Sequence, residues 1–69
     1  MPLTMTRAGE VNEIKRIGGK EEVRKFLETL GFVVGSRVSV VAENHRNVIV
    51  NIKDSRIAIS QEMANKIMV

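Results

Sequence analysis

The chain has 69 residues, of which 11 are Lys or Arg and 8 are Asp or Glu, giving a formal net charge of +3. It contains no Cys, so disulfides, thiolate metal sites and cysteine nucleophiles are excluded. A chain this short is expected to form one domain, residues 1–69, with a thin core. No apolar run approaches the roughly 18 residues that span a bilayer, so we expect a soluble protein without membrane insertion.

The positive charge does not by itself indicate a nucleic-acid partner. The basic residues are spread from Arg7 to Lys66 among acidic ones, and Phe26 and Phe32 are the only aromatic residues. Proteins that bind single strands without sequence preference usually stack bases on aromatic side chains. Both Phe residues are expected to have structural roles, so we expect no nucleic-acid partner.

The N-terminal part is expected to form strands. Met1–Arg7 alternates apolar and polar residues, as an edge strand does. The next segment, Glu10–Ile17, is ambiguous, because its apolar residues recur every third position as on a helix while its composition and flanking glycines favour a strand. We choose the strand, with a bulge that brings Val11 and Ile14 onto one face.

Lys20–Leu30 is the clearest element of the chain, because its apolar residues at i, i+3, i+4 and i+7 predict an amphipathic helix. Gly31 stands where a left-handed residue ends a helix, and Phe32 beyond it can fold back onto the last turn. The expected core face of this helix consists of Val23, Phe26, Leu27 and Leu30.

After Gly35 the hydrophobic period becomes two, which predicts strands. We expect a three-stranded antiparallel meander, then a helical turn capped by Ser60 and a last strand, Ile67–Val69. The expected strands are residues 37–43, 48–53 and 56–59, and in the first of them Val38, Val40 and Ala42 share a face.

These elements define the fold class as mainly β, a small α+β protein with five to six short strands, one amphipathic helix and a short C-terminal helical turn. Closing the sheet into a small barrel hides the strand edges and lets the first and last strands pair. The helix is then expected to plug or flank one end of the barrel.

No group of residues indicates catalysis, because the chain has one His, no Cys and no cluster of carboxylates. We therefore do not expect an enzyme. His45 and Glu43, in the polar loop Glu43–Asn47, offer at most two ligands to a divalent metal, whereas zinc and iron sites usually have three or four. We favour a solvated loop histidine, with weak metal contact as the alternative.

The connection after the helix carries three consecutive apolar residues, Phe32, Val33 and Val34. We favour packing of this connection into the core; the alternative leaves Val33 or Val34 partly exposed as a docking point for a partner. Arg24 and Lys25 on the charged face of the helix can steer such an encounter. These five residues form the candidate partner-binding site.

Several short motifs follow one another in a specific order over essentially all 69 residues. They are Met1-Pro2-Leu3, Gly18-Gly19, the helix end Leu30-Gly31-Phe32, Gly35-Ser36 with Val38, the strand Ile57-Ala58-Ile59, and Ala64 with Ile67-Met68-Val69. With this order and spacing, the chain resembles the ferrous-iron transport protein A family, FeoA.

The resemblance implies a Src-homology-3-like (SH3-like) barrel and a small cytoplasmic accessory protein of ferrous iron transport. It implies contact with the cytosolic part of FeoB, the membrane transporter that carries Fe(II) inward, and recruitment to the inner face of the membrane. No cofactor is required on this interpretation, and binding of Fe2+ or Zn2+ is at most weak. The alternative is a metal-responsive or nucleic-acid-associated regulator related to the C-terminal barrel of iron-dependent repressors. We expect a monomer.

Overall fold

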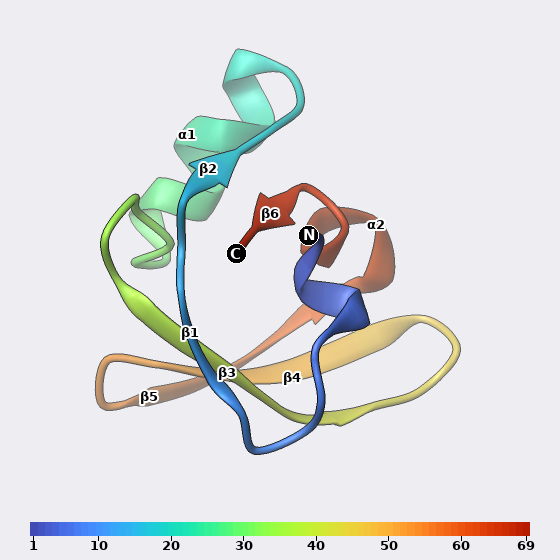
Figure 1. Cartoon of the computed structure of the whole chain (residues 1–69). Coiled ribbons are helices and arrows are strands. Elements are labelled where there is room, and N and C mark those ends of the chain that lie inside the picture. Colours follow the sequence, from blue (N-terminus) through green and yellow to red (C-terminus); the bar gives the residue numbers. More distant parts are fainter.

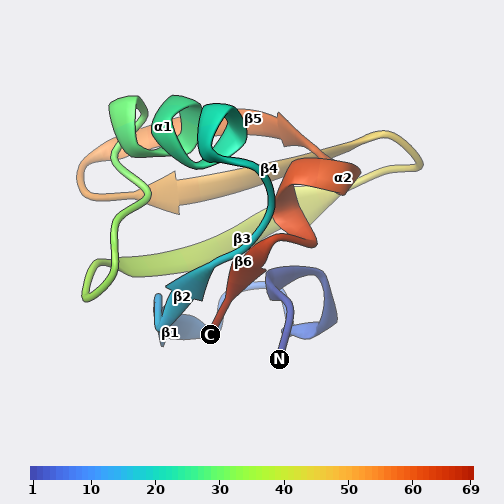
Figure 2. The same cartoon turned by 90° about the horizontal axis from the view of Figure 1, so that it is seen from above.

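Six short strands, two α-helices and one 3₁₀ turn make up the computed structural model, which describes residues 1–69 (Figure 1). Their bounds are η1 (Leu3–Met5), β1 (Val11–Glu13), β2 (Arg16–Ile17), α1 (Glu21–Thr29), β3 (Arg37–Glu43), β4 (Asn47–Ile52), β5 (Ser55–Ser60), α2 (Gln61–Ala64) and β6 (Ile67–Met68). Four strands form one antiparallel sheet in the order β1-β3-β4-β5, and β2 pairs antiparallel with β6. Figure 2 shows β3, β4 and β5 side by side and β2 next to β6.

One apolar core joins the two sheets. It contains 12 buried residues, none of them polar, and nearly every element contributes to it. A single core shared by two small antiparallel sheets is the arrangement that a small barrel requires. The buried residues are Leu3, Ile14, Leu27, Phe32, Val38, Val40, Val48, Val50, Ile52, Ile59, Ala64 and Ile67.

The predicted meander is confirmed, and its middle strand shows the clearest alternation. In β4, Val48, Val50 and Ile52 are buried, while Ile49 faces solvent. Because successive side chains of a strand point to opposite faces, one side of β4 faces the core and the other forms the outer surface.

In β3 the predicted alternation is partly wrong. Val38 and Val40 are buried as expected, but Ala42 is exposed. The register with β4 shifts between Val40 and Ala42, which is the mark of a β-bulge. The extra residue turns Ala42 to the outer face, and the sequence pattern carries no sign of it.

The prediction of a strand over Met1–Arg7 is wrong. Leu3–Met5 form a 3₁₀ turn, in which the Thr6 N–H donates to the Leu3 carbonyl at 3.1 Å and the Thr6 hydroxyl donates to the same oxygen at 2.7 Å. A threonine side chain that bonds to a nearby carbonyl competes with sheet formation, which explains the difference. The turn places Leu3 fully in the core.

The first and last segments nevertheless meet, as expected. Pro2 forms an isolated antiparallel bridge with Met68, and the Val69 N–H donates to the Met1 carbonyl at 2.8 Å. The two ends of the chain therefore lie side by side, as Figure 1 shows.

The second predicted strand is divided into β1 and β2. Val11 and Ile14 do not share a face, because Val11 is 62% exposed and Ile14 is fully buried. The backbone changes partners at this point: the Ile14 N–H donates to the Ser36 carbonyl and the Lys15 N–H to the Met68 carbonyl, both at 2.8 Å. The segment thus leaves the larger sheet and joins β6, so one bulge within a continuous strand is the wrong description.

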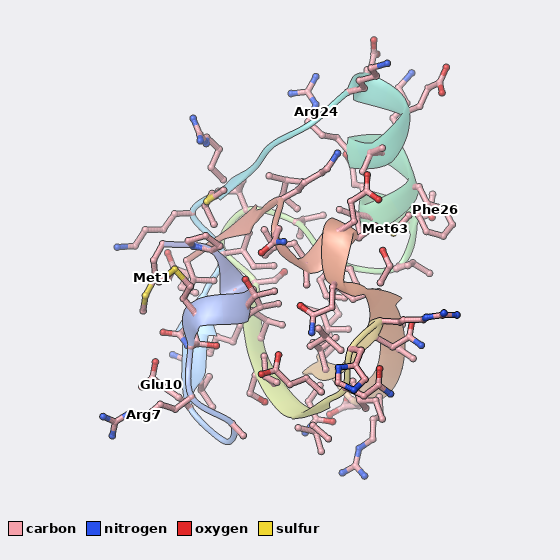
Figure 3. All side chains as sticks on the ribbon, turned by 90° about the vertical axis from the view of Figure 1, so that its right-hand side faces the viewer. Met1, Arg7, Glu10, Arg24, Phe26 and Met63 are labelled. Carbon is pink, nitrogen blue, oxygen red and sulfur yellow. The ribbon has the colours of Figure 1, made fainter.

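The predicted amphipathic helix is confirmed as α1, with Lys20 and Leu30 as its flanking cap residues. Leu27 is fully buried, and Leu30 packs against the core from one side, so the helix flanks the barrel. Phe26 departs from the expected core face, because it is 48% exposed and Figure 3 shows it projecting outward from the helix.

The end of α1 has the hydrogen bonds of a Schellman motif. The Gly31 N–H donates to the Glu28 carbonyl and the Phe32 N–H donates to the Leu27 carbonyl, both at 3.0 Å. Gly31 has φ +103°, a conformation that residues with a side chain rarely adopt. Phe32 is fully buried in the same core as Leu27, which confirms the predicted fold-back.

The C-terminal elements are also as predicted. The Ser60 hydroxyl accepts a hydrogen bond from the Met63 N–H at 3.1 Å, as an N-cap does. The short helix α2 and the strand β6 follow, and they bring Ala64 and Ile67 into the core.

We predict that Gly31→Ala lowers the free energy of unfolding by about 1–2 kcal/mol, because alanine is strained at this φ. The added Cβ itself would meet only Ile52 Cγ1, at an ordinary 3.7 Å, so the cost comes from the backbone. Urea denaturation measures the change. Gly18→Ala is the matched control, because Gly18 has no left-handed φ and its Cβ would also meet one atom at 3.7 Å. Equal destabilisation by the two variants would contradict the argument.

Candidate functional site

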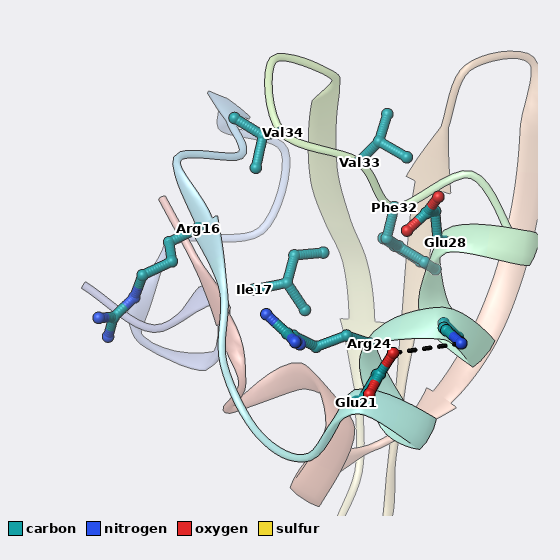
Figure 4. Close-up of a pocket in the computed structure, with 9 residues that line it drawn as sticks. Arg16, Ile17, Glu21, Arg24, Glu28, Phe32, Val33 and Val34 are labelled. Atoms are coloured by element: carbon teal, nitrogen blue, oxygen red, sulfur yellow. Dashed lines mark ion pairs between the residues drawn. The ribbon is translucent and has the colours of Figure 1, made fainter.

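A groove of about 580 Å³ lies between α1, β2 and the connection that follows α1 (Figure 4). Apolar residues contribute part of its lining and charged residues of α1 and β2 the rest. Its lining residues are Arg16, Ile17, Glu21, Arg24, Lys25, Glu28, Phe32, Val33 and Val34.

The helical wall of the groove carries charges of both signs, with Arg24 and Lys25 between Glu21 and Glu28. Its four residues stand at i, i+3, i+4 and i+7 of α1 and therefore share one face of the helix. Lys25 Nζ lies 3.2 Å from Glu21 Oε1, an exposed i, i+4 pair worth about 0.3–0.5 kcal/mol. Arg24 has no carboxylate within ion-pair distance. Its guanidinium extends toward Ile17 of β2, across the groove (Figure 4).

The opposite wall is the connection after α1, whose backbone is held by hydrogen bonds at both ends. The Ser36 N–H donates to the Val33 carbonyl at 3.0 Å, and the Gly35 N–H donates to the Ile14 carbonyl at 2.8 Å. Phe32 is buried beneath this wall, whereas Val34 is 66% exposed. The connection thus presents a fixed apolar side chain to solvent beside the charged helix.

The structure brings all five predicted partner-binding residues to this one groove. The favoured expectation that the whole connection packs into the core is wrong, because only Phe32 is buried while Val33 is half-buried and Val34 exposed. The physical reason is the turn at Gly31, which can direct only one of three successive side chains inward. That these residues bind a partner stays a prediction.

Sequence reasoning missed four lining residues, Arg16, Ile17, Glu21 and Glu28. The two glutamates could have been found, because they share a helical face with Arg24 at i−3 and i+4. No pattern in the sequence indicated Arg16 and Ile17, because their position depends on the pairing of β2 with the distant β6.

The candidate metal ligands lie elsewhere: Glu43 is the last residue of β3, and His45 is in the loop that joins β3 to β4. Asn44 Oδ1 accepts hydrogen bonds from the backbone N–H groups of Arg46 and Asn47, both at 2.9 Å, which shapes the turn. Gln61 Nε2 donates to Glu43 Oε2 at 3.4 Å. His45 is exposed.

Nothing in the fold adds a third ligand to His45 and Glu43. No group of three or more His, Cys, Asp or Glu residues is placed to hold a metal ion. Structural and catalytic zinc sites have at least three protein ligands, so this donor set does not fit such a site. Binding of Fe2+ or Zn2+ at the loop stays a prediction.

Neither helix of the structure has the length and apolar character needed to cross a membrane.

The fold defines the class of the protein as an SH3-like small barrel. FeoA from Chlorobium tepidum matches with a TM-score of 0.88 at 24% identity, covering 99% of this chain and 67% of that one. The zinc complex of FeoA from Stenotrophomonas maltophilia, described as a procaryotic SH3 domain protein and a proposed ferrous iron transport activating factor, matches with a TM-score of 0.84 at 20% identity. That match covers 99% of this chain and 87% of the other.

The family is shown by the sequence itself. The model of the FeoA domain matches residues 1–69. A candidate Fe(2+) transport protein A of Methanocaldococcus jannaschii is 34% identical over 68 residues, which are 99% of this chain and 83% of that relative. The chain therefore belongs to the FeoA family, which is involved in ferrous iron transport, as its sequence motifs predicted.

We predict that Zn2+ binds the β3–β4 loop weakly, with a dissociation constant in about the millimolar range, because only two exposed side chains can act as ligands. NMR titration with Zn2+ should shift the signals of Glu43 to Asn47, and His45→Asn should remove these shifts. Sub-micromolar binding, or shifts centred on another part of the barrel, would contradict this assignment.

Proposed function

We propose that this protein is a cytoplasmic accessory and regulatory protein of ferrous iron transport that acts by contact with FeoB, without catalysis of its own. The groove between α1 and the connection after it is the proposed docking site. The observation that carries the proposal is the convergence of Val33, Val34, Arg24 and Lys25 on this groove, above the fully buried Phe32. Membership of the FeoA family supplies the context of ferrous iron transport.

The character of the groove supports a protein partner. Protein interfaces combine a central apolar contact with a polar, charged rim, and Arg is among the residues that most often carry the binding energy. Here Val34 supplies exposed apolar surface, the partly buried Ile17 adds to it, and Arg24 has no ion-pair partner. The guanidinium is therefore available to a carboxylate of the partner.

The size of the groove supports a transient contact. The groove is lined by 9 residues, fewer than the roughly 20–30 residues that each partner contributes to a standard-size interface. A weak and reversible contact suits regulation of a transporter, because the regulator must be able to leave. Recruitment to the inner face of the membrane would then depend on the partner alone.

The metal-responsive or nucleic-acid-associated alternative has less support. The candidate metal ligands are only two, and the groove cations of α1 are flanked by Glu21 and Glu28 instead of forming a basic stripe. The NMR titration described for Zn2+ can also be run with Fe(II) under anaerobic conditions and with a DNA duplex. Signal shifts caused by Fe(II) would support the metal-responsive alternative, and shifts caused by DNA would support the nucleic-acid-associated one.

We expect Val34→Asp to weaken binding to the cytosolic domain of the cognate FeoB at least tenfold, about 1.4 kcal/mol, because a charge replaces the exposed apolar contact. Isothermal titration calorimetry and NMR titration measure the affinity and locate the contact. Arg24→Glu should weaken binding similarly by reversing the charge of the unpaired side chain.

Val11→Asp is the matched control, because Val11 is also an exposed valine and lies outside the groove. It should leave the affinity unchanged. The proposal is overturned if the wild-type protein does not bind the FeoB domain, or if Val11→Asp and Val34→Asp weaken binding equally.

A further inference from the structure

The strand β5 forms an end of the four-stranded sheet, so one of its edges has no neighbouring strand. No hydrogen bond from another segment reaches the backbone of Arg56 or Ala58 outside the pairing with β4. The edge also lacks the usual protective features, since β5 contains no Pro, its register with β4 is continuous, and Arg56 is its only charged residue. This edge is therefore open to another strand.

The register with β4 shows which backbone groups face outward. The Gln61 N–H donates to the Arg46 carbonyl at 2.8 Å, so this pair is hydrogen-bonded. Hydrogen-bonded and non-hydrogen-bonded pairs alternate along an antiparallel ladder. The N–H and C=O groups of Ile57 and Ile59 therefore point toward β4, and those of Arg56, Ala58 and Ser60 point away from it.

We propose that the free edge of β5 pairs antiparallel with the same edge of a second copy of this chain, about a two-fold axis at Ala58. This register makes Ala58 of the two copies a hydrogen-bonded pair and places Arg56 opposite Ser60 of the second copy. Together these pairs supply about four hydrogen bonds across the interface, because the Ser60 carbonyl at the N-cap of α2 already accepts the first bond of that helix.

The occupant is a second copy because the segment is nearly palindromic. Ser55–Ser60 reads Ser-Arg-Ile-Ala-Ile-Ser, so a two-fold axis at Ala58 puts Ile57 opposite Ile59 of the second copy. No charged side chain lies directly opposite a like charge, which would destabilise the pair. Ile57 and Ile59 are β-branched, a residue type that is favoured in strands, and both lie on the core-facing side of β5.

A two-fold axis at Ile57 fits less well. That register would pair Ser60 with Asp54 of the second copy, and Asp54 lies in the turn before β5 begins. It would also place Ile59 opposite Ser55 of the second copy, so Ile57 and Ile59 would no longer face each other across the interface as they do with the axis at Ala58.

The pairing is independent of the proposed docking of FeoB. No residue of β5 lines the groove, so both surfaces can be occupied at once. A strand of six residues is only about 20 Å long, so the contact is small and the dimer dissociates at low concentration. Two paired copies would present two grooves to one partner assembly.

Sedimentation equilibrium from about 10 µM to 1 mM tests the pairing, together with Ala58→Lys. The wild type should show a mass that rises toward the dimer, and Ala58→Lys should weaken association at least tenfold because two lysine side chains then face each other across the axis. Ala42→Lys is the matched control. Ala42 is also an exposed alanine on the outer face, but it lies in β3, which β4 separates from β5. It should leave association unchanged.

Hydrogen exchange of the wild type provides a second measurement that needs no variant. The amides of Arg56 and Ala58 should exchange more slowly as the protein concentration rises, while the amide of His45 in the exposed loop should not change. A wild type that stays monomeric at about 1 mM overturns the proposal. So does a dimer that forms equally in Ala58→Lys and leaves these amides unprotected.

Discussion

The left-handed turn at Gly31 is the constraint on which both the core and the groove depend. At φ +103° the chain leaves α1 so that Phe32 enters the core beside Leu27. The same turn leaves Val34 in solvent, facing the charged side of the helix. The residue that ends the helix therefore also fixes one wall of the candidate site, and a change there would alter stability and the site together.

The charged side chains of this protein lie on its surface, and its buried core is entirely apolar. The core contains no polar residue, and the one ion pair, between Lys25 and Glu21, lies on the exposed rim of the groove. Stability then comes mainly from apolar burial and the backbone ladder, while the charged groups contribute little to it. Charged residues at the groove are consequently available for recognition, and we expect their replacement to change the stability of the barrel little.

The sequence predicted those parts of the fold that depend on local chemistry. The helix, its glycine stop, the Ser60 cap and the β3–β4–β5 meander each follow from a short pattern, and each is present. Two errors occur where distant segments decide the structure, at the change of partners at Ile14 and at the bulge before Ala42. The turn at Leu3 has a local cause, because Thr6 bonds to the Leu3 carbonyl.

The residues of the candidate site also divide into those that a local sequence pattern predicts and those that depend on a distant segment. Arg24, Lys25 and the apolar connection were recognisable from helical spacing and from an unusual apolar run in a loop. Arg16 and Ile17 were not, because only the pairing of β2 with β6 brings them to the groove. Periodicity describes a face of one element, and it carries no information on which other element lies opposite.

The pairing of β2 with β6 also has a kinetic consequence. The meander of β3, β4 and β5 joins strands that are neighbours in the chain, so it can assemble by closing short loops. The β2–β6 ladder instead requires Ile17 to meet Ile67 near the opposite end, with most of the chain as the intervening loop. Non-local pairing of this kind slows the folding of small β proteins. The groove wall that β2 supplies is thus completed only when the C-terminal strand arrives, so a newly synthesised chain completes the groove only after its last residues have been made.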